Sequence, residues 1–418
     1  MNRRRLIGVW LVLLVVCGQS HAGGPLAVAG TVFNPAVDGK ALVWDSTAAV
    51  SYRTPNAGNL GKLDNATASA RVQTLFKVWE DVSTSNIRFQ NAGPIQNVGA
   101  YQGGAVNSAA KFNAVDGSCG NGLQSPIVFD ADGSLFTQLG LDADVIGFAG
   151  PCSVDLGTGH ITAAEAVLNG KWIDNNRSNR ELTDNQFDET FVHEFGHFIG
   201  LDHSQISVAV LGQPPDHCSV DLLAALPVMF PFAHCQARAD ASLPILSADD
   251  QAWISMLYPE TTNDPPNKHE RFDQKYGVIS GKVVFSDAQS LAQGVNVLAE
   301  DSNGSNSLKF SVVSGYLFTG NPGQSVTGTN DGDGGLGSHD QSLIGTFDIP
   351  AKPGTYTLRL EPIFPEFVGG SGVGPLFPFP IAGVVANGTV TVTAGSTTAV
   401  TDIPLTNPQP RFDQFEDK

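Results

Sequence analysis

The chain has 418 residues, of which 41% are hydrophobic and only 15% are charged, and its formal net charge at pH 7 is −18. Its 46 glycines and 25 prolines are typical of a loop-rich or β-rich globular protein and argue against a coiled coil or a disordered chain. So acidic a surface repels phosphate backbones, which excludes nucleic acid as an expected partner. The length predicts two or three domains.

Residues 1–22 are typical of a secretory signal peptide. Arg3–Arg5 give a basic start, and the apolar run Leu6–Val16 is too short to span a bilayer. A lipoprotein signal that uses Cys17 is the alternative. No other segment is apolar and long enough to cross a membrane. We therefore expect a secreted, extracellular protein, with retention at the cell envelope as the alternative.

The chain then alternates between strand and helix patterns. Residues 23–40 are rich in glycine, proline and small side chains, which predicts an extended lead-in. Residues 66–81 carry apolar side chains at helical spacing and predict an amphipathic helix, whereas residues 90–123 show no period and predict a long surface loop. Period-two alternation or short apolar runs predict strands at 41–54, 87–90, 125–130, 145–148 and 160–169.

The stretch Phe191–Ser204 contains the pattern H-E-x-x-H-x-x-G-x-x-H. On a helix, residues four apart share a face, so His193 and His197 can point two imidazoles at one metal ion. Gly200 allows the helix to end in a left-handed turn. The reversed chain can then bring His203 round as a third ligand.

Three protein ligands leave one coordination position open, which is the catalytic rather than the structural arrangement of zinc. Glu194 follows the first ligand, so its carboxylate can reach a water on the metal without ligating the metal itself. The pattern therefore predicts one catalytic Zn²⁺ with Glu194 as general base. A helix that carries histidines by chance is the alternative.

Local signals also predict where the helices around this motif begin and end. Thr183 and Gln186 form a capping-box pattern at the start of the motif helix. Ser247 is a good N-cap for a last helix that runs to Tyr258, where Pro259 ends it. One apolar stripe recurs every four residues and predicts a core-facing side of the motif helix, formed by Phe187, Phe191, Phe195 and Ile199.

Four cysteines follow the predicted signal peptide, and an even number in an exported chain predicts disulfides. Sequence proximity favours Cys119–Cys152 and Cys218–Cys235 among the three pairings. The second bond would staple the loop after the zinc motif. The alternative is a second zinc site that uses His217-Cys218 and His234-Cys235, although that spacing matches no familiar ligand set.

The residue pattern changes after the last predicted helix. Residues 261–276 are polar and contain prolines, which predicts a linker. Residues 277–406 are short alternating runs separated by turns, which predicts an all-β sandwich, and residues 407–418 form a charged tail. Ca²⁺ is an alternative to a solvated turn at the acidic segments Asp130–Gly133 and Asn330–Gly335.

Three separated motifs together resemble the metzincin zinc proteases, and most closely the matrixin (matrix metalloproteinase-like) group. They are the zinc motif that ends in Leu201–Ser204, the later Val228–Pro231, and the closing segment Leu246–Pro259. The resemblance covers Ala41 to Pro259. It implies an α+β catalytic domain over residues 41–260, with a mixed twisted sheet, about three helices and the active-site helix beneath a substrate cleft.

The resemblance also implies roles for single residues. It implies zinc ligands at His193, His197 and His203, a general base at Glu194, and a Met-turn at Met229. We find neither the Pro-Arg-Cys-Gly-like cysteine switch nor the His-x-Asp ligands of a second, structural zinc that matrixins use. The C-terminal region resembles carboxypeptidase-regulatory-like β-sandwiches in three motifs, Gly277–Val283, Gly294–Val297 and Pro353–Leu358.

The hypothesis that the sequence favours is a secreted zinc endopeptidase that acts on protein or peptide substrates, as a monomer by default. The strand at Val145–Phe148 would bind substrate as an added strand, and the segment after Met229 would shape the specificity pocket. One alternative is a binding or adhesive protein that uses the sandwich, with the metal domain as a scaffold. Another is a zinc hydrolase with non-protein substrates.

Overall fold

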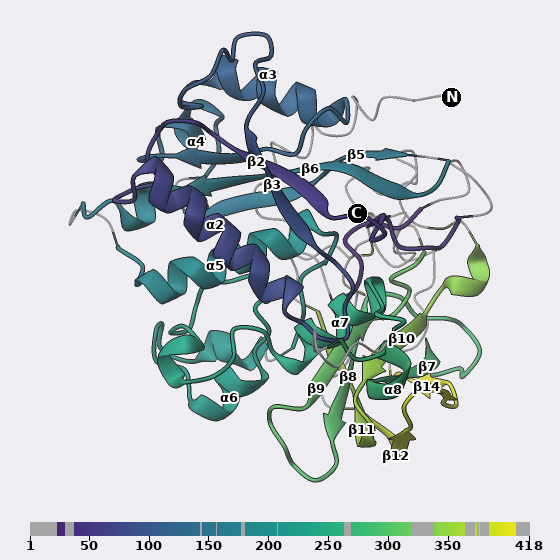
Figure 1. Cartoon of the computed structure of the whole chain (residues 1–418). Helices are drawn as coiled ribbons and strands as arrows, with labels where there is room; N and C mark the ends of the chain where they lie inside the picture. The colour runs from purple at the N-terminus through teal and green to yellow at the C-terminus, as the bar shows by residue number, and fades with distance from the viewer. Residues whose placement is uncertain are drawn as a thin grey trace, which may run out of the picture.

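The computed structural model shows a helix-and-sheet part, coloured purple to teal, beside a part made mainly of strands, coloured green to yellow (Figure 1). The predicted signal peptide, the charged tail, residues 263–268 of the predicted linker and the Asn330–Gly335 segment lie outside the described residues. The structure describes residues 23–29, 37–142, 144–155, 157–176, 180–206, 208–262, 269–318, 338, 340–363, 373, 376 and 384–406.

The first part is built on a mixed sheet of strand order β3-β2-β4-β6-β5. β2 and β3 pair in parallel, β4 and β6 pair in parallel, and a parallel bridge between Arg53 and Pro126 joins β2 to β4. β5 pairs antiparallel with β6 and forms the edge. The strands are β2 (Val50–Thr54), β3 (Phe89–Pro94), β4 (Ile127–Asp130), β5 (Gly147–Asp155) and β6 (His160–Asn169), and β1 (Val43–Trp44) pairs with the start of β6.

Helices cover both faces of this sheet, which explains why β4 and most of β6 are buried. Alternate side chains of β6 enter different clusters: Ala166 and Leu168 pack with α2 (Asn65–Glu80) and α5 (Asp184–Phe198), and Val167 packs on the opposite face. The rings of Phe76 and Phe195 stack with centroids 3.8 Å apart. The central helix α5 therefore packs both against the sheet and against α2, which lies beside it on the same face (Figure 1).

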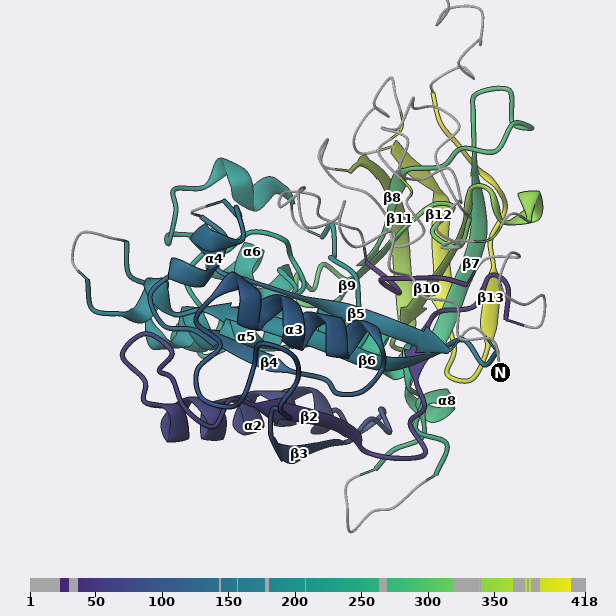
Figure 2. The same cartoon turned by 90° about the horizontal axis from the view of Figure 1, so that it is seen from above.

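The prediction of a long surface loop over residues 90–123 is wrong in its second half. Residues Ala109–Gly120 form helix α3, which lies over the sheet near the short helix α4 (Ser134–Gln138), as seen from above in Figure 2. The period was hidden because the buried face of α3 is narrow: Phe112, Val115, Ser118 and Cys119. Four helices in the described part have ten or more residues, one more than the sequence suggested.

The chain between α5 and the strand-rich part has little regular structure. Its helices are α6 (Val220–Ala225) and α7 (Ala248–Leu257), with 3-10 turns at Val208–Gly212 and Ala239–Ala241. A further 3-10 turn, Gly170–Ile173, follows β6. The capping boxes at Thr183–Gln186 and Ser247–Asp250 are both present, so α5 and α7 begin where the sequence predicts.

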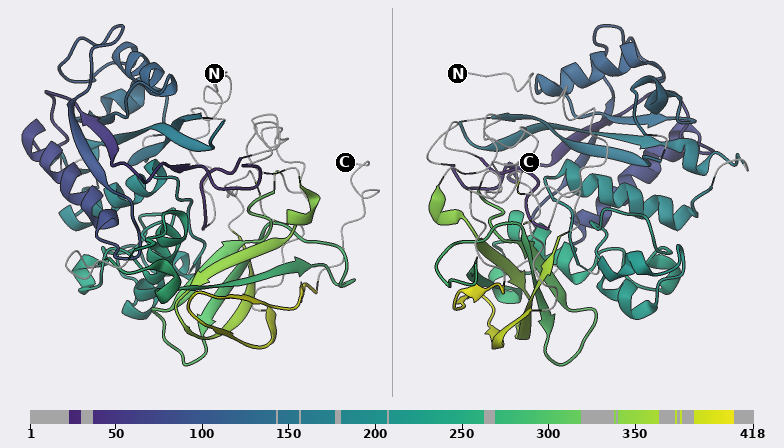
Figure 3. Two further views of the ribbon diagram at one scale, coloured as in Figure 1. Left: turned by 45° about the vertical axis from the view of Figure 1, so that its right-hand side comes forward. Right: turned by 180° about the vertical axis from the view of Figure 1, so that it is seen from behind.

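The C-terminal residues form two four-stranded sheets, both visible in Figure 3. One has the order β10-β7-β13 with β14 also on β7, and the other has the order β12-β11-β8-β9. After α8 (Phe272–Lys275) the strands are β7 (Gly277–Val284), β8 (Val295–Asp301), β9 (Lys309–Val313), β10 (Thr346–Ala351), β11 (Gly354–Pro362), β12 (Val384–Val392), β13 (Thr397–Ala399) and β14 (Ile403–Pro404), with a 3-10 turn at Gln341–Leu343.

The two parts share one buried hydrophobic cluster. It includes Trp253 of α7 together with Phe310 and Val312 of β9. The start of the described chain reaches the turn that ends α5, because the amide of Leu26 donates to the carbonyl of Gly200 at 2.7 Å. In the part of the chain that the structure describes, no helix is long and apolar enough to cross a membrane.

Candidate metal centre

The three motif histidines converge at the C-terminal end of α5. His193 and His197 project from the helix one turn apart, and the helix ends in a turn at Gly200, whose φ is +85°. A residue with a Cβ would be strained in that left-handed conformation. After this turn the chain reverses and brings His203 back, as the spacing predicts.

The Nε2 atoms of these histidines form a tight triangle. The distance is 3.1 Å between His193 and His197, and 2.9 Å from each of them to His203. The Nδ1 atoms of His193 and His197 lie 2.7 Å and 2.9 Å from the carbonyl oxygens of Val228 and Leu201. A carbonyl only accepts hydrogen bonds, so each Nδ1 carries the proton and each Nε2 keeps its lone pair.

This donor set fits a metal ion. Burial lowers the pKa of His193 to about 4, so its imidazole is neutral. Neutral imidazole lone pairs that face one another cannot satisfy each other, whereas a Zn²⁺ ion accepts three such nitrogens. Among the described residues, this is the only group of three or more histidine, cysteine or acidic side chains close enough to hold a metal ion.

Glu194 lies between the metal-binding face of α5 and the edge strand β5. Its side chain is 6% exposed, and burial raises its pKa to about 8. A Cβ on Gly147 would lie 3.0 Å from its Cγ and 3.2 Å from its Oε1. Gly147, the first residue of β5, therefore allows the close approach of this carboxyl group. The sequence alone did not identify this role of Gly147.

Met229 packs against α5 between His193 and His197, at Gly196. A Cβ on Gly196 would overlap the Met229 sulfur and would lie 3.1 Å from the ring of Trp79. The amides of Val228 and Met229 donate to Asp250 at 2.9 Å and 3.2 Å. Asp250 thus fixes the backbone whose Val228 carbonyl orients His193. The sequence did not identify Gly196 or Asp250 as supporting residues, although Asp250 lies in the first turn of the predicted helix that begins at Ser247.

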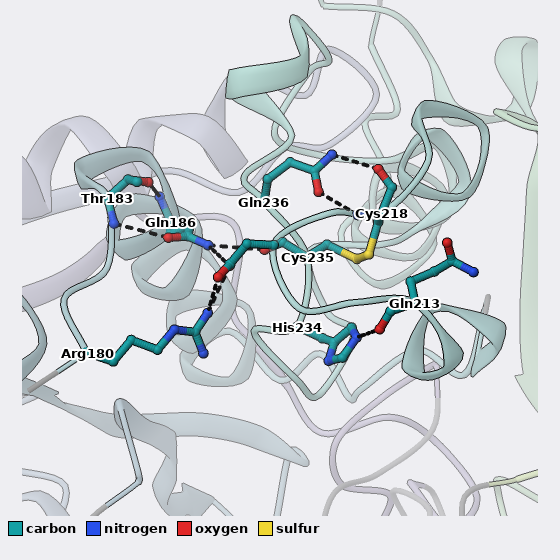
Figure 4. Close-up of polar contacts among 9 residues, drawn as sticks. Arg180, Thr183, Gln186, Gln213, Cys218, His234, Cys235 and Gln236 are labelled. Carbon is teal, nitrogen blue, oxygen red and sulfur yellow. Dashed lines mark hydrogen bonds and ion pairs between the residues drawn. A yellow bond between two sulfur atoms is a disulfide. The ribbon is translucent and has the colours of Figure 1, made fainter.

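A disulfide closes the segment between His203 and α7. Cys218 and Cys235 are joined, with Cα atoms 5.4 Å apart. Gln186 of α5 reaches this segment, since its Nε2 donates to Asp216 at 2.7 Å and to the Cys235 carbonyl at 3.2 Å (Figure 4). Disulfide sulfurs are not thiolate ligands, so the alternative of a second zinc site at these cysteines is wrong.

The second disulfide connects helix α3 to the edge strand β5. Cys119 of α3 and Cys152 of β5 are joined, with Cα atoms 5.7 Å apart. Both disulfides are therefore the pairs that sequence proximity favours.

Asp130, considered for Ca²⁺ or for a solvated turn, is buried and accepts the amide of Phe136 at 2.9 Å. His160 contacts the carbonyl of Val43 through Nδ1, a structural role.

Comparison with known proteins agrees with this geometry. The family model described as Matrixin matches residues 43–215, which include all three histidines and Glu194 but neither Met229 nor the C-terminal strands. A search of curated proteins gives no match. The match supports a matrixin-like metzincin domain in this part of the chain, with an α+β fold and a catalytic zinc ion. It supports a metalloprotease activity and peptide substrates.

Proposed function

We propose that this chain is a secreted zinc-dependent endopeptidase in which Glu194 is the general base and His193, His197 and His203 hold the metal. The observation that carries the proposal is the convergence of three imidazole Nε2 atoms beside one buried carboxyl group. When bound, zinc supplies Lewis acidity, which polarises a scissile carbonyl and makes water a better nucleophile at neutral pH.

The residues of the chain would supply positioning and proton transfer. The carbonyls of Val228 and Leu201 hold two imidazoles in the tautomer that leaves Nε2 free. A Glu194 oxygen would take the proton from the attacking water and deliver it to the leaving amine.

The edge strand β5 is our candidate for substrate binding. Within the described residues β5 pairs only with β6, and we propose that its other edge binds an extended peptide. Gly147 at its start lies against Glu194, which would place an added strand beside the base. We propose that Met229 forms a Met-turn and that the residues after it, Phe230–Phe232, shape the specificity pocket.

We further propose the domain organisation that the sequence predicts. Residues 1–22 would be removed as a signal peptide, and residues 41–260 would form the catalytic domain. After a linker at 261–276, residues 277–406 would form a β-sandwich from the two C-terminal sheets. Two disulfides are consistent with an extracellular location.

The proposed mechanism is tested with the purified full chain and the variant Glu194→Gln. The zinc-loaded wild type should cleave an unfolded protein substrate, and a zinc chelator should stop the cleavage. Loss of the general base should lower kcat by roughly 10²-fold to 10⁴-fold while zinc content stays equal to that of wild type. Asp188→Asn on the same helix, whose carboxylate pairs with Arg71, is the matched control and should retain activity.

Two results would contradict the proposal. Full activity of Glu194→Gln would remove this residue from the mechanism. A wild type that holds zinc but cleaves no peptide would favour the alternative of a binding or adhesive protein, and a peptide-library digest would separate it from a zinc hydrolase with other substrates.

A further inference from the structure

One residue of the C-terminal strands, Ser311 on β9, contacts three residues around the metal centre. It is fully buried. Its amide donates to Asp249 Oδ1 at 2.9 Å, and its carbonyl accepts the indole N–H of Trp253 at 2.9 Å. Its hydroxyl lies 3.4 Å from that of Ser204. Ser311 therefore joins β9 both to α7 and to the chain immediately after the motif.

Ser204 in turn is connected to the metal ligands. It follows His203 directly, and its amide donates to the carbonyl of Met229 at 2.9 Å. Its hydroxyl also interacts with Asp249. Ser204, Asp249 and Ser311 thus form a buried polar cluster that lies one residue from His203.

Apolar contacts support the same junction. Ile206 and Ala225 form a buried cluster with Leu298 of β8. Phe232, which follows the Met229 turn, packs against Val313 and Ile363. The C-terminal strands therefore pack against Ile206 and against Phe232, which lie before and after Met229 in the chain.

His203 depends on such support more than the other ligands do. His193 and His197 are fixed by the backbone of α5, whereas His203 comes after the Gly200 turn and lies outside any helix or strand. Its position is set by tertiary contacts of the residues around it. Those contacts run through Ser204 to Met229 and to the C-terminal strands.

We propose that Ser311 is a positioning residue for the metal centre. The C-terminal strands then help to hold the catalytic site and are not an independent domain. This inference rests on the proposed metal-dependent function. It predicts that the Ser311 hydroxyl, acting through Ser204, affects how His203 holds the metal.

The test uses full-length variants that differ only in one hydroxyl. Ser311→Val and Ser311→Thr have nearly the same shape, both suit a strand, and only threonine keeps the hydroxyl. Ser311→Ala removes the hydroxyl without adding volume. Ser314 is the matched control, because it is equally buried but its hydroxyl donates to Ala292 within the C-terminal strands. The readouts are Zn²⁺ affinity by chelator competition, the visible spectrum of the Co²⁺ form, kcat and KM, and the unfolding midpoint.

Loss of one neutral hydrogen bond should weaken Zn²⁺ affinity of Ser311→Val and Ser311→Ala by about threefold to tenfold and shift the Co²⁺ spectrum. Ser311→Thr should stay near wild type. Ser314→Val should lower the unfolding midpoint relative to Ser314→Thr without a change in affinity or spectrum.

Equal Zn²⁺ affinities for Ser311→Val, Ser311→Ala and Ser311→Thr would overturn the proposal. So would equal losses at Ser314, which would indicate a general effect of stability. A wild type that binds Zn²⁺ but cleaves nothing would refute the protease activity, yet the affinity comparison at Ser311 would still decide this inference. A wild type that holds no Zn²⁺ would refute both.

Discussion

The two sides of the metal centre are held in different ways. On the sheet side, formed by β5, β6 and α3, regular backbone pairing places the edge strand next to Glu194. On the turn side, residues 204–258, short helices and turns are held by individual side chains. Asp250 binds two amides there, and Gln186 binds Asp216 and the carbonyl of Cys235.

This difference predicts where single substitutions change the site. On the sheet side, many ladder hydrogen bonds share the task of positioning, so loss of one side chain should lower stability and leave the metal-binding geometry intact. On the turn side, one side chain serves several backbone groups, so its loss should lower both stability and metal affinity.

The largest effect is expected for Asp250→Ala on the turn side. Asp250 accepts the amides of Val228, Met229 and Ser247, and the substitution leaves these buried donors without their acceptor. At about 1–3 kcal/mol for each of the three unsatisfied groups, the free energy of unfolding should fall by roughly 3–9 kcal/mol. Because Val228 also orients His193, Zn²⁺ affinity should fall as well.

Urea unfolding and chelator competition measure these two effects of Asp250→Ala. Asp221→Ala is the control, since Asp221 is also an acidic residue in the first turn of a helix but is exposed. It should change stability by less than about 0.5 kcal/mol. An unchanged Zn²⁺ affinity in a folded Asp250→Ala chain would contradict the assignment of this positioning to the turn side.

The two disulfides allow a direct comparison of the sides. Their sequence separations are 33 for Cys119–Cys152 and 17 for Cys218–Cys235. Loop-closure entropy predicts that replacing each pair by serine costs about 3.7 and about 3.1 kcal/mol, respectively. Loss of Cys218–Cys235 should lower Zn²⁺ affinity more than loss of Cys119–Cys152, because only Cys218–Cys235 closes the segment that carries Met229. Thermal unfolding and Zn²⁺ titration of both double variants test this ordering, and a greater loss of affinity without Cys119–Cys152 would reverse the comparison.

The sequence predicted the parts of the site that depend on local spacing. His193, His197, Gly200 and His203 lie in one short stretch, so helix geometry alone brings their side chains together. The capping box of α5 and the N-cap Ser247 of α7 were recognisable for the same reason, since each signal lies within one helical turn of the helix start.

The groups that support this stretch were not predictable, because they come from distant parts of the chain. Gly147 on β5 and Ser311 on β9 approach the site only after the sheets have formed. Their residue types are ordinary in strands and carry no local signal. Helix α3 was missed for a related reason: its glycine, alanine and asparagine residues give weak periodicity, and packing on the sheet and the bond to Cys152 stabilise it.

The smallest effect on metal affinity is expected on the sheet side, at the pair formed by the partly buried Asp116 on α3 and the buried Glu165 on β6. Burial, followed by the proximity and hydrogen bond of Asp116, raises the pKa of Glu165 well above its usual range, and burial raises that of Asp116. The folded chain therefore binds more protons here than the unfolded chain. The contribution of the pair to stability is fully present below the unfolded pKa values, near pH 4, and is lost as the pH rises through the folded ones.

Glu165→Gln should remove this dependence, because a glutamine amide can donate to Asp116 at every pH. The difference in unfolding free energy between variant and wild type should grow with pH, with a slope of at most about 1.4 kcal/mol per pH unit for one proton. Urea unfolding from pH 5 to 8 measures this difference. The whole of this range lies above the usual pKa of a carboxyl group, which is about 4. Because the pair lies on the sheet side, Zn²⁺ affinity at pH 7, measured on the same samples, should not change. A parallel loss of metal affinity would show that α3 and β6 also position the ligands, and the distinction between the two sides would then fail.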